Sequence, residues 1–301
     1  MTDVTPNMTP LTEASTPAPP KRARERFGVI FWIAAGFVGL VAAVAVTCQW
    51  LPLADPNLGD YTAAPMALPS WSHWLGTDNL GRDILARLCY GARISVSVSF
   101  GTMAIGILVG GSLGMLAAFR GGKTDLALNS LMIVGVSYPS FVAVLVILGL
   151  WQPVSIVKMI FILGIFSVPL VFILIRGATL SYSTREFVMA AKALGATNTR
   201  VLVREVLPNV LPAMMTVFLL GIANVVVLEG SLAFLGRGIA DPTPSWGKMI
   251  NDGSGQFAIY TGFQQYQLAF FPALTVFLFL VSLFLIGDKM RARYDVSEGR
   301  L

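Results

Sequence analysis

The sequence predicts an all-α membrane protein with six transmembrane helices. Of its 301 residues, 55% are apolar and 12% are charged, whereas an average soluble domain has about 45–50% apolar and about 25% charged residues. Long apolar runs without charge recur along the chain, and a helix needs about 20 such residues to cross a bilayer core of about 30 Å. This composition excludes an ordinary water-soluble enzyme.

The first 26 residues are expected to form a disordered tail. Residues 1–20 are rich in Thr and Pro and lack apolar periodicity, and a basic cluster at 21–26 then precedes an apolar run. That run is longer than the roughly 7–15 apolar residues of a secretory signal. We therefore predict an uncleaved first span.

Six apolar runs are candidate membrane spans. We place them at 27–50, 94–119, 127–150, 157–176, 208–232 and 267–287. Only Trp151–Lys158 separates the third span from the fourth. A turn is expected there, because Pro153 disfavours a continuous helix and Trp151 suits a membrane interface.

The basic residues predict how these spans are oriented. With six spans both termini lie on one side, and 15 of the 21 Lys and Arg residues fall on that side. The positive-inside rule then places both termini in the cytoplasm and the segments 51–93 and 233–266 outside.

The spans divide the chain into four regions. They are a disordered cytoplasmic tail at 1–26, a first span with its external segment at 27–93, a core transmembrane domain at 94–290 and a cytoplasmic tail at 291–301. The core contains a long cytoplasmic loop at 183–209.

Glycines and polar residues inside the spans have different predicted uses. Gly106, Gly110 and Gly114 recur every four residues and form a smooth ridge on which another helix can pack closely. Asn224 and Glu229 are polar groups in or near the fifth span, where an acid is costly unless it faces protein, water or an interface. Glu229 either lines a pathway or makes a structural hydrogen bond near the external end.

The residues that metal, redox or catalytic sites need are scarce. Cys48 and Cys89 lack metal-ligand or redox spacing, and His73 is the single histidine. No Ser/His/Asp set or carboxylate pair can be assembled. The net charge of +5 comes from residues at the ends of apolar runs. We therefore expect no catalysis, no metal and no cofactor in this chain, and no nucleic acid as a partner.

One stretch imitates a phosphate-binding loop. Residues 117–124 read A-A-F-R-G-G-K-T, but a true phosphate loop follows a strand and opens a helix. Here a membrane helix precedes it. We interpret Arg120–Lys123 as a short cytoplasmic turn.

The loop at 183–209 is predicted to hold two short helices. Ser183 and Glu186 have capping-box spacing, and Gly195 suits the left-handed position after a helix. Thr197 or Asn198 can cap a second helix that runs towards the fifth span. Such a knob can dock a protein or lie on lipid headgroups, and the spacing alone does not choose between them.

The same loop resembles the E-A-A-x-x-x-G motif of permease subunits in bacterial ATP-binding-cassette importers. The matching positions are Glu186, Ala190, Ala191 and Gly195, within E-F-V-M-A-A-K-A-L-G. Further segments resemble the C-type permease of dipeptide, oligopeptide and nickel importers. These are L-G-T-D-N-L-G-R-D at 75–83, Y-G-A-R-I-S at 90–95, L-A-F-L-G at 232–236 and P-T-P-S-W-G at 242–247. Ser167–Pro169 and Gln256–Gln267 depart from the family's pattern.

The resemblance implies the type I importer permease fold in the bacterial inner membrane and a chain that transports without catalysis. The loop would be a coupling helix, with Glu186, Ala190, Ala191, Leu194 and Gly195 at the ATPase. The implied partners are a B-type permease, two ATPase subunits that hold ATP and magnesium, a substrate-binding protein outside and membrane lipid. The implied cargo is a peptide, with nickel as the alternative.

Two other classes of protein fit the sequence less well. An ion-coupled secondary transporter usually needs ion sites within the membrane, often on broken helices, and the sequence offers only Glu229 without an obvious partner. A membrane enzyme lacks its catalytic residues.

Overall fold

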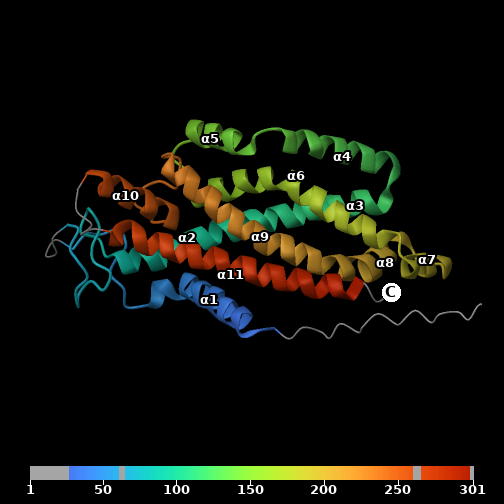
Figure 1. Ribbon diagram of the computed structural model, residues 1–301. Coiled ribbons are helices and arrows are strands. Elements are labelled where there is room, and N and C mark those ends of the chain that lie inside the picture. Colours follow the sequence, from blue (N-terminus) through green and yellow to red (C-terminus); the bar gives the residue numbers. More distant parts are fainter. Residues whose placement is uncertain (1–26, 61–64, 260–265, 299–301) are drawn as a thin grey trace, which may run out of the picture.

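The computed structural model describes residues 27–60, 65–259 and 266–298, and these residues form a bundle of long helices (Figure 1). The helices are α1 (Val29–Thr47), η1 (Cys48–Trp50), α2 (Ile84–Ile105), η2 (Gly106–Gly111), α3 (Ser112–Arg120), α4 (Gly122–Ser137), α5 (Ser140–Leu150), α6 (Ile156–Ser183), α7 (Glu186–Ala193), α8 (Asn198–Val201), η3 (Leu202–Val206), α9 (Leu207–Phe234), α10 (Trp246–Ile259) and α11 (Gln267–Glu298). Within the described residues the β structure is a single bridge between Thr77 and Asp83. The predicted all-α class is confirmed.

The described chain supplies six candidate membrane crossings. Five are helical segments that are long and apolar enough to span, at 29–50, 84–120, 156–183, 198–234 and 267–292. The sixth is the pair α4 and α5, whose axes differ by 74° across a short break. Five of the six predicted spans are thus present as helical segments, and the predicted third span corresponds to this bent pair.

The second span begins ten residues earlier than predicted. Arg87 and Arg93 lie inside α2, and their charges led the sequence-based boundary to be placed at 94. Arg87 Nη1 donates to the carbonyl of Pro56 at 2.9 Å, and Arg93 Nη1 donates to Gln49 Oε1 at 2.8 Å. Because both guanidinium groups find acceptors outside α2, the helix continues through them. The predicted boundary between 93 and 94 is thus no break in the structure.

Two other boundaries also shift. α6 continues past 176 to Ser183, because Arg176 pairs with Asp125 of α4. α11 runs on to Glu298, so no break separates the core from the tail predicted at 291–301. The helix α10 was not predicted, and it packs against α9 and α11. The disordered tail predicted at 1–26 lies outside the described residues, as do residues 260–265 of the unusual Gln256–Gln267 stretch.

The bundle has two distinct ends (Figure 1). One, here called the α7 end, carries α7, α8, the turn between α3 and α4 and the last turns of α11. The other, here called the α10 end, carries α10, the described residues of the segment 51–83 and the turn between α5 and α6. The loops that the charge count assigned to one side thus gather at one end of the bundle.

The predicted glycine ridge is a contact between helix backbones. A Cβ atom added at Gly110 would lie 2.5 Å from the carbonyl oxygen of Val168, and one at Gly114 would lie 2.6 Å from that of Phe172. At Gly106 the nearest atom is instead the side-chain Oγ of Ser167, at 2.6 Å. The absence of side chains here lets α2, η2 and α3 approach α6 closely, as the four-residue spacing predicted.

Candidate coupling surface and transport cavity

The helix α7 has an exposed face with a small residue, Ala190, at its centre. Glu186, Ala190 and Leu194 follow one another every four residues and are all exposed, and Leu194 is 89% exposed. Residues four apart lie on the same face of a helix. The structure thus brings three of the five predicted coupling residues into one row.

The opposite face of α7 holds the loop to the bundle. Val188 is fully buried, and Phe187 and Ala191 pack against the same core. Ala191 is therefore half-buried support for the exposed row rather than part of it. Val201 of α8 is also fully buried. Buried residues on both short helices attach the loop to the α7 end of the bundle.

Gly195 ends α7 in the predicted left-handed conformation. Its φ is +80°, and its N–H donates to the carbonyl of Lys192 at 3.0 Å. The next N–H, that of Ala196, donates to the carbonyl of Ala191 at 3.1 Å. These two bonds define a Schellman motif. Nothing lies within 4 Å of an added Cβ atom, so only the backbone conformation restricts this position to glycine.

The two predicted caps have different outcomes. Thr197 caps α8, because its Oγ1 accepts a hydrogen bond from the N–H of Arg200 at 3.4 Å. The capping box of Ser183 and Glu186 is wrong. The N-cap of α7 is Arg185, and Ser183 donates its hydroxyl to the carbonyl of Leu180 at 3.1 Å. Because Ser183 is the last residue of α6, its hydroxyl binds the preceding turn of α6 instead of capping α7.

A large cavity lies between the broken span and the centre of the bundle. Its volume is about 840 Å³, and its walls are the broken span, α6 and α9. Most lining residues are apolar. Polar groups come from Ser140, Ser167, Ser181, Tyr182, Thr216 and Asn224, and among the described lining residues only Arg291 is charged. A cavity of this size and chemistry can accept a small organic solute along a largely uncharged surface.

The two candidate pathway residues occupy different places. Asn224 lines the cavity and donates its Nδ2 to the carbonyl of Leu220 at 3.0 Å. Glu229, one turn further along α9, is 1% exposed and is not among the lining residues. Pathway roles for both remain predictions.

Glu229 sits at a junction of three elements at the α10 end. Ser245 Oγ donates to its Oε1 at 2.6 Å, and Ser95 Oγ of α2 donates to its Oε2 at 3.3 Å. Ser95 Oγ also accepts the N–H of Trp246 at 3.2 Å, and the indole Nε1 of Trp246 donates to the carbonyl of Leu88 at 3.1 Å. One acid therefore fastens the start of α10 to both α2 and α9.

The motif at 75–83 builds a second polar cluster at the same end. Asp78 Oδ1 accepts the N–H groups of Leu80 and Arg82, both at 2.9 Å, and its Oδ2 accepts from Arg82 Nε at 2.7 Å. Asp83 caps α2 through the N–H of Ala86 at 2.7 Å and meets His73 Nδ1 at 2.8 Å. Both clusters stiffen the α10 end.

Nearby, Lys248 of α10 donates to Asp241. This hydrogen bond lowers the pKa of the Asp241 carboxyl. The ion pair connects α10 to the segment that follows α9.

Sequence reasoning recognised the 75–83 motif but not the hydrogen bonds within it, and it missed the partnerships between residues that are far apart in the chain. His73 stood out only as the single histidine. Glu229 and Ser95 are 134 residues apart, so no local spacing reveals their contact. Groups of three or more His, Cys, Asp or Glu side chains suited to a metal ion are not found in the described part of the chain.

The phosphate-loop imitation forms a helical corner. Residues 117–120 end α3, and Gly121 and Gly122 have φ of +64° and +57° before Lys123 enters the first turn of α4. The preceding element is a helix, whereas a phosphate loop follows a strand. The lack of nucleotide binding remains a prediction.

Comparison with known proteins identifies the architecture. Residues 104–296 match the family described as "Binding-protein-dependent transport system inner membrane component". The chain belongs to this family. A glutathione transport system permease protein, GsiD of Pectobacterium atrosepticum, is 33% identical over 268 residues, which are 87% of this chain and 86% of the relative.

A dipeptide transport system permease protein, DppC of Alkalihalophilus pseudofirmus, is 33% identical over 227 residues, which are 75% of this chain and 73% of the relative. Among solved structures, a chain of the MetNI methionine ABC transporter in inward-facing conformations has a TM-score of 0.55 at 16% identity. The match covers 70% of this chain and 97% of that chain. The predicted importer-permease fold is therefore confirmed. As a family member, this chain is a multi-pass inner-membrane component of a transport system that works with a binding protein.

Proposed function

We propose that the chain is the non-catalytic permease subunit of an ATP-driven peptide importer. Two relatives that match most of the chain are named as glutathione and dipeptide permeases, and both cargoes are short peptides. This similarity carries the substrate proposal. It favours peptide over nickel, and the low charge of the cavity lining is compatible with a passage for neutral or zwitterionic solutes.

The geometry of the two ends supports the proposed partners. The exposed row of Glu186, Ala190 and Leu194 is the surface offered to an ATPase subunit. α6 and α9, which emerge on either side of this loop, also line the cavity. A push on α7 is thus transmitted directly to two cavity walls. A similar permease closes the pathway from its open side, and ATP and magnesium are held by the two ATPases.

The proposed orientation places the α7 end in the cytoplasm. The α10 end then faces the binding protein, and both termini lie in the cytoplasm. The basic residues support this assignment, since 15 of 21 belong to the segments that the sequence predicts to be cytoplasmic.

Reconstitution tests the function directly. The chain is purified with its companion permease, ATPases and binding protein and placed in proteoliposomes. Uptake of labelled dipeptide, glutathione and Ni²⁺ is measured with ATP and with a non-hydrolysable analogue. ATP-dependent peptide uptake that needs the binding protein supports the proposal. Preferential Ni²⁺ uptake would reassign the cargo, and uptake by the isolated chain driven by an ion gradient would contradict the importer assignment.

A further inference from the structure

The broken span is the most loosely held wall of the cavity. In the described chain α4 packs mainly against α3 and α6, and α5 packs mainly against α6. Met132 is the buried residue of α4, and Val144 and Leu148 are those of α5. With so little burial, the few specific contacts of this wall determine where it stands.

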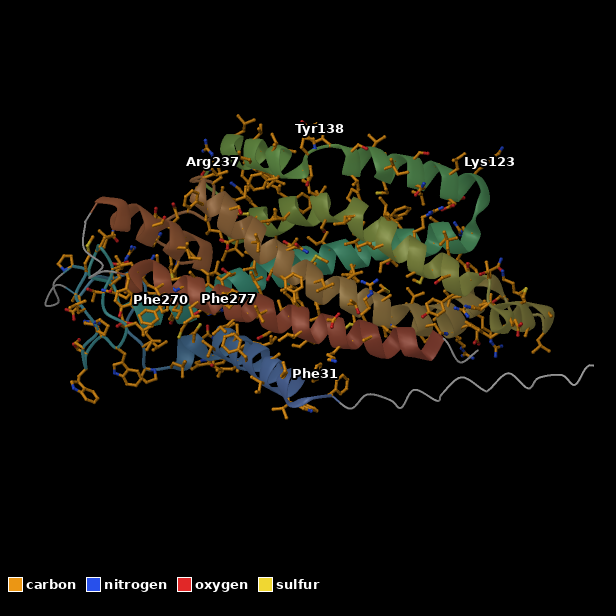
Figure 2. The ribbon with its side chains drawn as sticks, viewed as in Figure 1. Phe31, Lys123, Tyr138, Arg237, Phe270 and Phe277 are labelled. Carbon is orange, nitrogen blue, oxygen red and sulfur yellow. The ribbon has the colours of Figure 1, made fainter. Side chains whose placement is uncertain are left out.

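The break divides the wall into two arms. Tyr138 has extended backbone angles, with φ of −83° and ψ of 136°, and Pro139 follows it (Figure 2). A residue before proline is pushed out of the helical region, so the two arms meet at a non-helical joint. Beside this joint Gly135 approaches Pro169 of α6, and an added Cβ atom would lie 2.8 Å from Pro169 Cγ. The joint lies against a fixed point on α6.

One ion pair holds the arm nearest the α7 end. Arg176 Nε and Nη2 donate to the two carboxylate oxygens of Asp125, both at 2.6 Å. The side chains are 23% and 19% exposed. Asp125 lies in the first turn of α4, and Arg176 lies two turns before α6 ends at Ser183 and the loop to α7 begins. A bidentate, partly buried pair is directional and stronger than an ordinary surface salt bridge.

A second contact joins α7 to the end of α3, next to the corner where the α4 arm begins. The ammonium group of Lys192 lies 5.1 Å from the centre of the Phe119 ring at the end of α3, which is within cation–π range. After Phe119 the chain passes through Gly121 and Gly122, where added Cβ atoms would meet nothing within 4 Å. This corner is uncrowded, so it can swivel while α3 stays in place.

We propose that Asp125 and Arg176 are positioning residues that make the α4 arm move with the coupling loop. This inference rests on the proposed function. When an ATPase moves α7, the end of α6 moves with it, and the ion pair carries α4 along. The α4 arm then turns about Tyr138–Pro139, and the cavity changes shape on the side of the broken span. Without the ion pair, α7 and the ATPases still bind each other, but the α4 arm no longer moves with the coupling loop.

The test uses the complete transporter in proteoliposomes with Asp125→Asn, Arg176→Gln and the double variant. We expect ATPase association and hydrolysis within about twofold of wild type, while peptide uptake falls on the order of tenfold in each single variant. Because both residues act as one unit, the double variant is expected to be no worse than either single variant. Asp125→Glu, which keeps the charge, is expected to recover most of the uptake.

A distance measurement separates positioning from simple stability. Spin labels are attached at Ser130→Cys, which is exposed on the α4 arm, and at Thr216→Cys, which lines the cavity from α9, after Cys48 and Cys89 have been replaced. Vanadate trapping with ATP is expected to shift the label distance in the parent transporter and to leave it unchanged in Asp125→Asn. Asp241→Asn, which removes the Lys248 ion pair at the other end, is the matched control and is expected to retain the shift.

Several results would overturn the proposal. They are normal uptake in both single variants, additive losses in the double variant, an unchanged distance shift in Asp125→Asn, or a parallel loss of ATPase association and uptake. Failure of the proposed function is distinguishable, because the parent transporter would then show no ATP-dependent peptide uptake.

Discussion

The two ends of the bundle are held together by different kinds of contact. At the α10 end, buried polar groups join elements that are distant in sequence, and Glu229 alone reaches Ser95 and Ser245. At the α7 end, small buried apolar residues such as Val188 and Val201 seat two short helices whose outer face is open. Buried hydrogen bonds are costly to break, whereas an apolar seat can slide without losing a specific partner. The comparison indicates that the α10 end is rigid and that the α7 end can move.

The largest expected effect is on stability, at the α10 end. Glu229→Ala leaves the hydroxyls of Ser95 and Ser245 without their shared acceptor in a buried site. We expect the free energy of unfolding to fall by about 2–3 kcal/mol, measured by thermal unfolding of the purified protein in detergent. Glu229→Gln retains an acceptor and serves as the control. If Glu229→Gln instead abolished uptake at normal stability, Glu229 would belong to the pathway rather than to the structural hydrogen bonds of the α10 end.

A smaller effect is expected at the α7 end, and it concerns the coupling of ATP hydrolysis to uptake. Gly195→Val forces a β-branched residue to a φ of +80°, which costs on the order of 1–2 kcal/mol and tilts α7 against α8. We expect uptake to fall about tenfold, the change that about 1.4 kcal/mol produces in an equilibrium, while the protein remains in the membrane. Uptake is measured together with co-purification of the ATPases.

Gly195→Asn is the matched control for that variant, because asparagine tolerates the left-handed conformation and no neighbour restricts its side chain. Normal coupling in Gly195→Val would show that the Schellman turn does not position the exposed row. Ala190→Trp then offers a separate test, since Ala190 lies in that row and Ala191 does not.

Lys123→Ala is expected to change little, although Lys123 is at the same end (Figure 2). The side chain is exposed at the α3–α4 corner, and substitutions at such positions stay within about 0.5 kcal/mol. ATPase activity of the assembled transporter is therefore expected within about twofold of wild type. A loss of ATP binding by the permease itself would reinstate the phosphate loop.

Thiol labelling of cysteine variants that leave activity unchanged assigns the two ends of the bundle to the two sides of the membrane. With Cys48 and Cys89 replaced, Gly255→Cys in α10 is expected to react with an impermeant thiol reagent added to intact cells. Thr197→Cys is expected to be protected until the cells are opened. The reverse labelling pattern would invert the orientation.

Local chemistry explains which features could be predicted from the sequence. Gly195 and Thr197 were predicted correctly because a helix end is decided by a few neighbouring residues. The start of α2 was missed because Arg87 donates a hydrogen bond to the carbonyl of Pro56, which is 31 residues away. The bend at Tyr138–Pro139 was missed because the apolar run continues unbroken through it. The Asp125–Arg176 pair was likewise hidden, since it joins helices whose contact follows only from the whole fold.

The glycine ridge has a consequence for how this protein can evolve. At Gly110 and Gly114 the groups in the way of a larger residue are the carbonyls of Val168 and Phe172. A carbonyl is the same whatever side chain its residue carries, so no substitution on α6 can make room for a new side chain opposite it. Aligned descendants of this sequence are therefore expected to keep these glycines without correlated changes at 168 and 172, so methods that infer contacts from paired substitutions would overlook one of the tightest seams in the molecule.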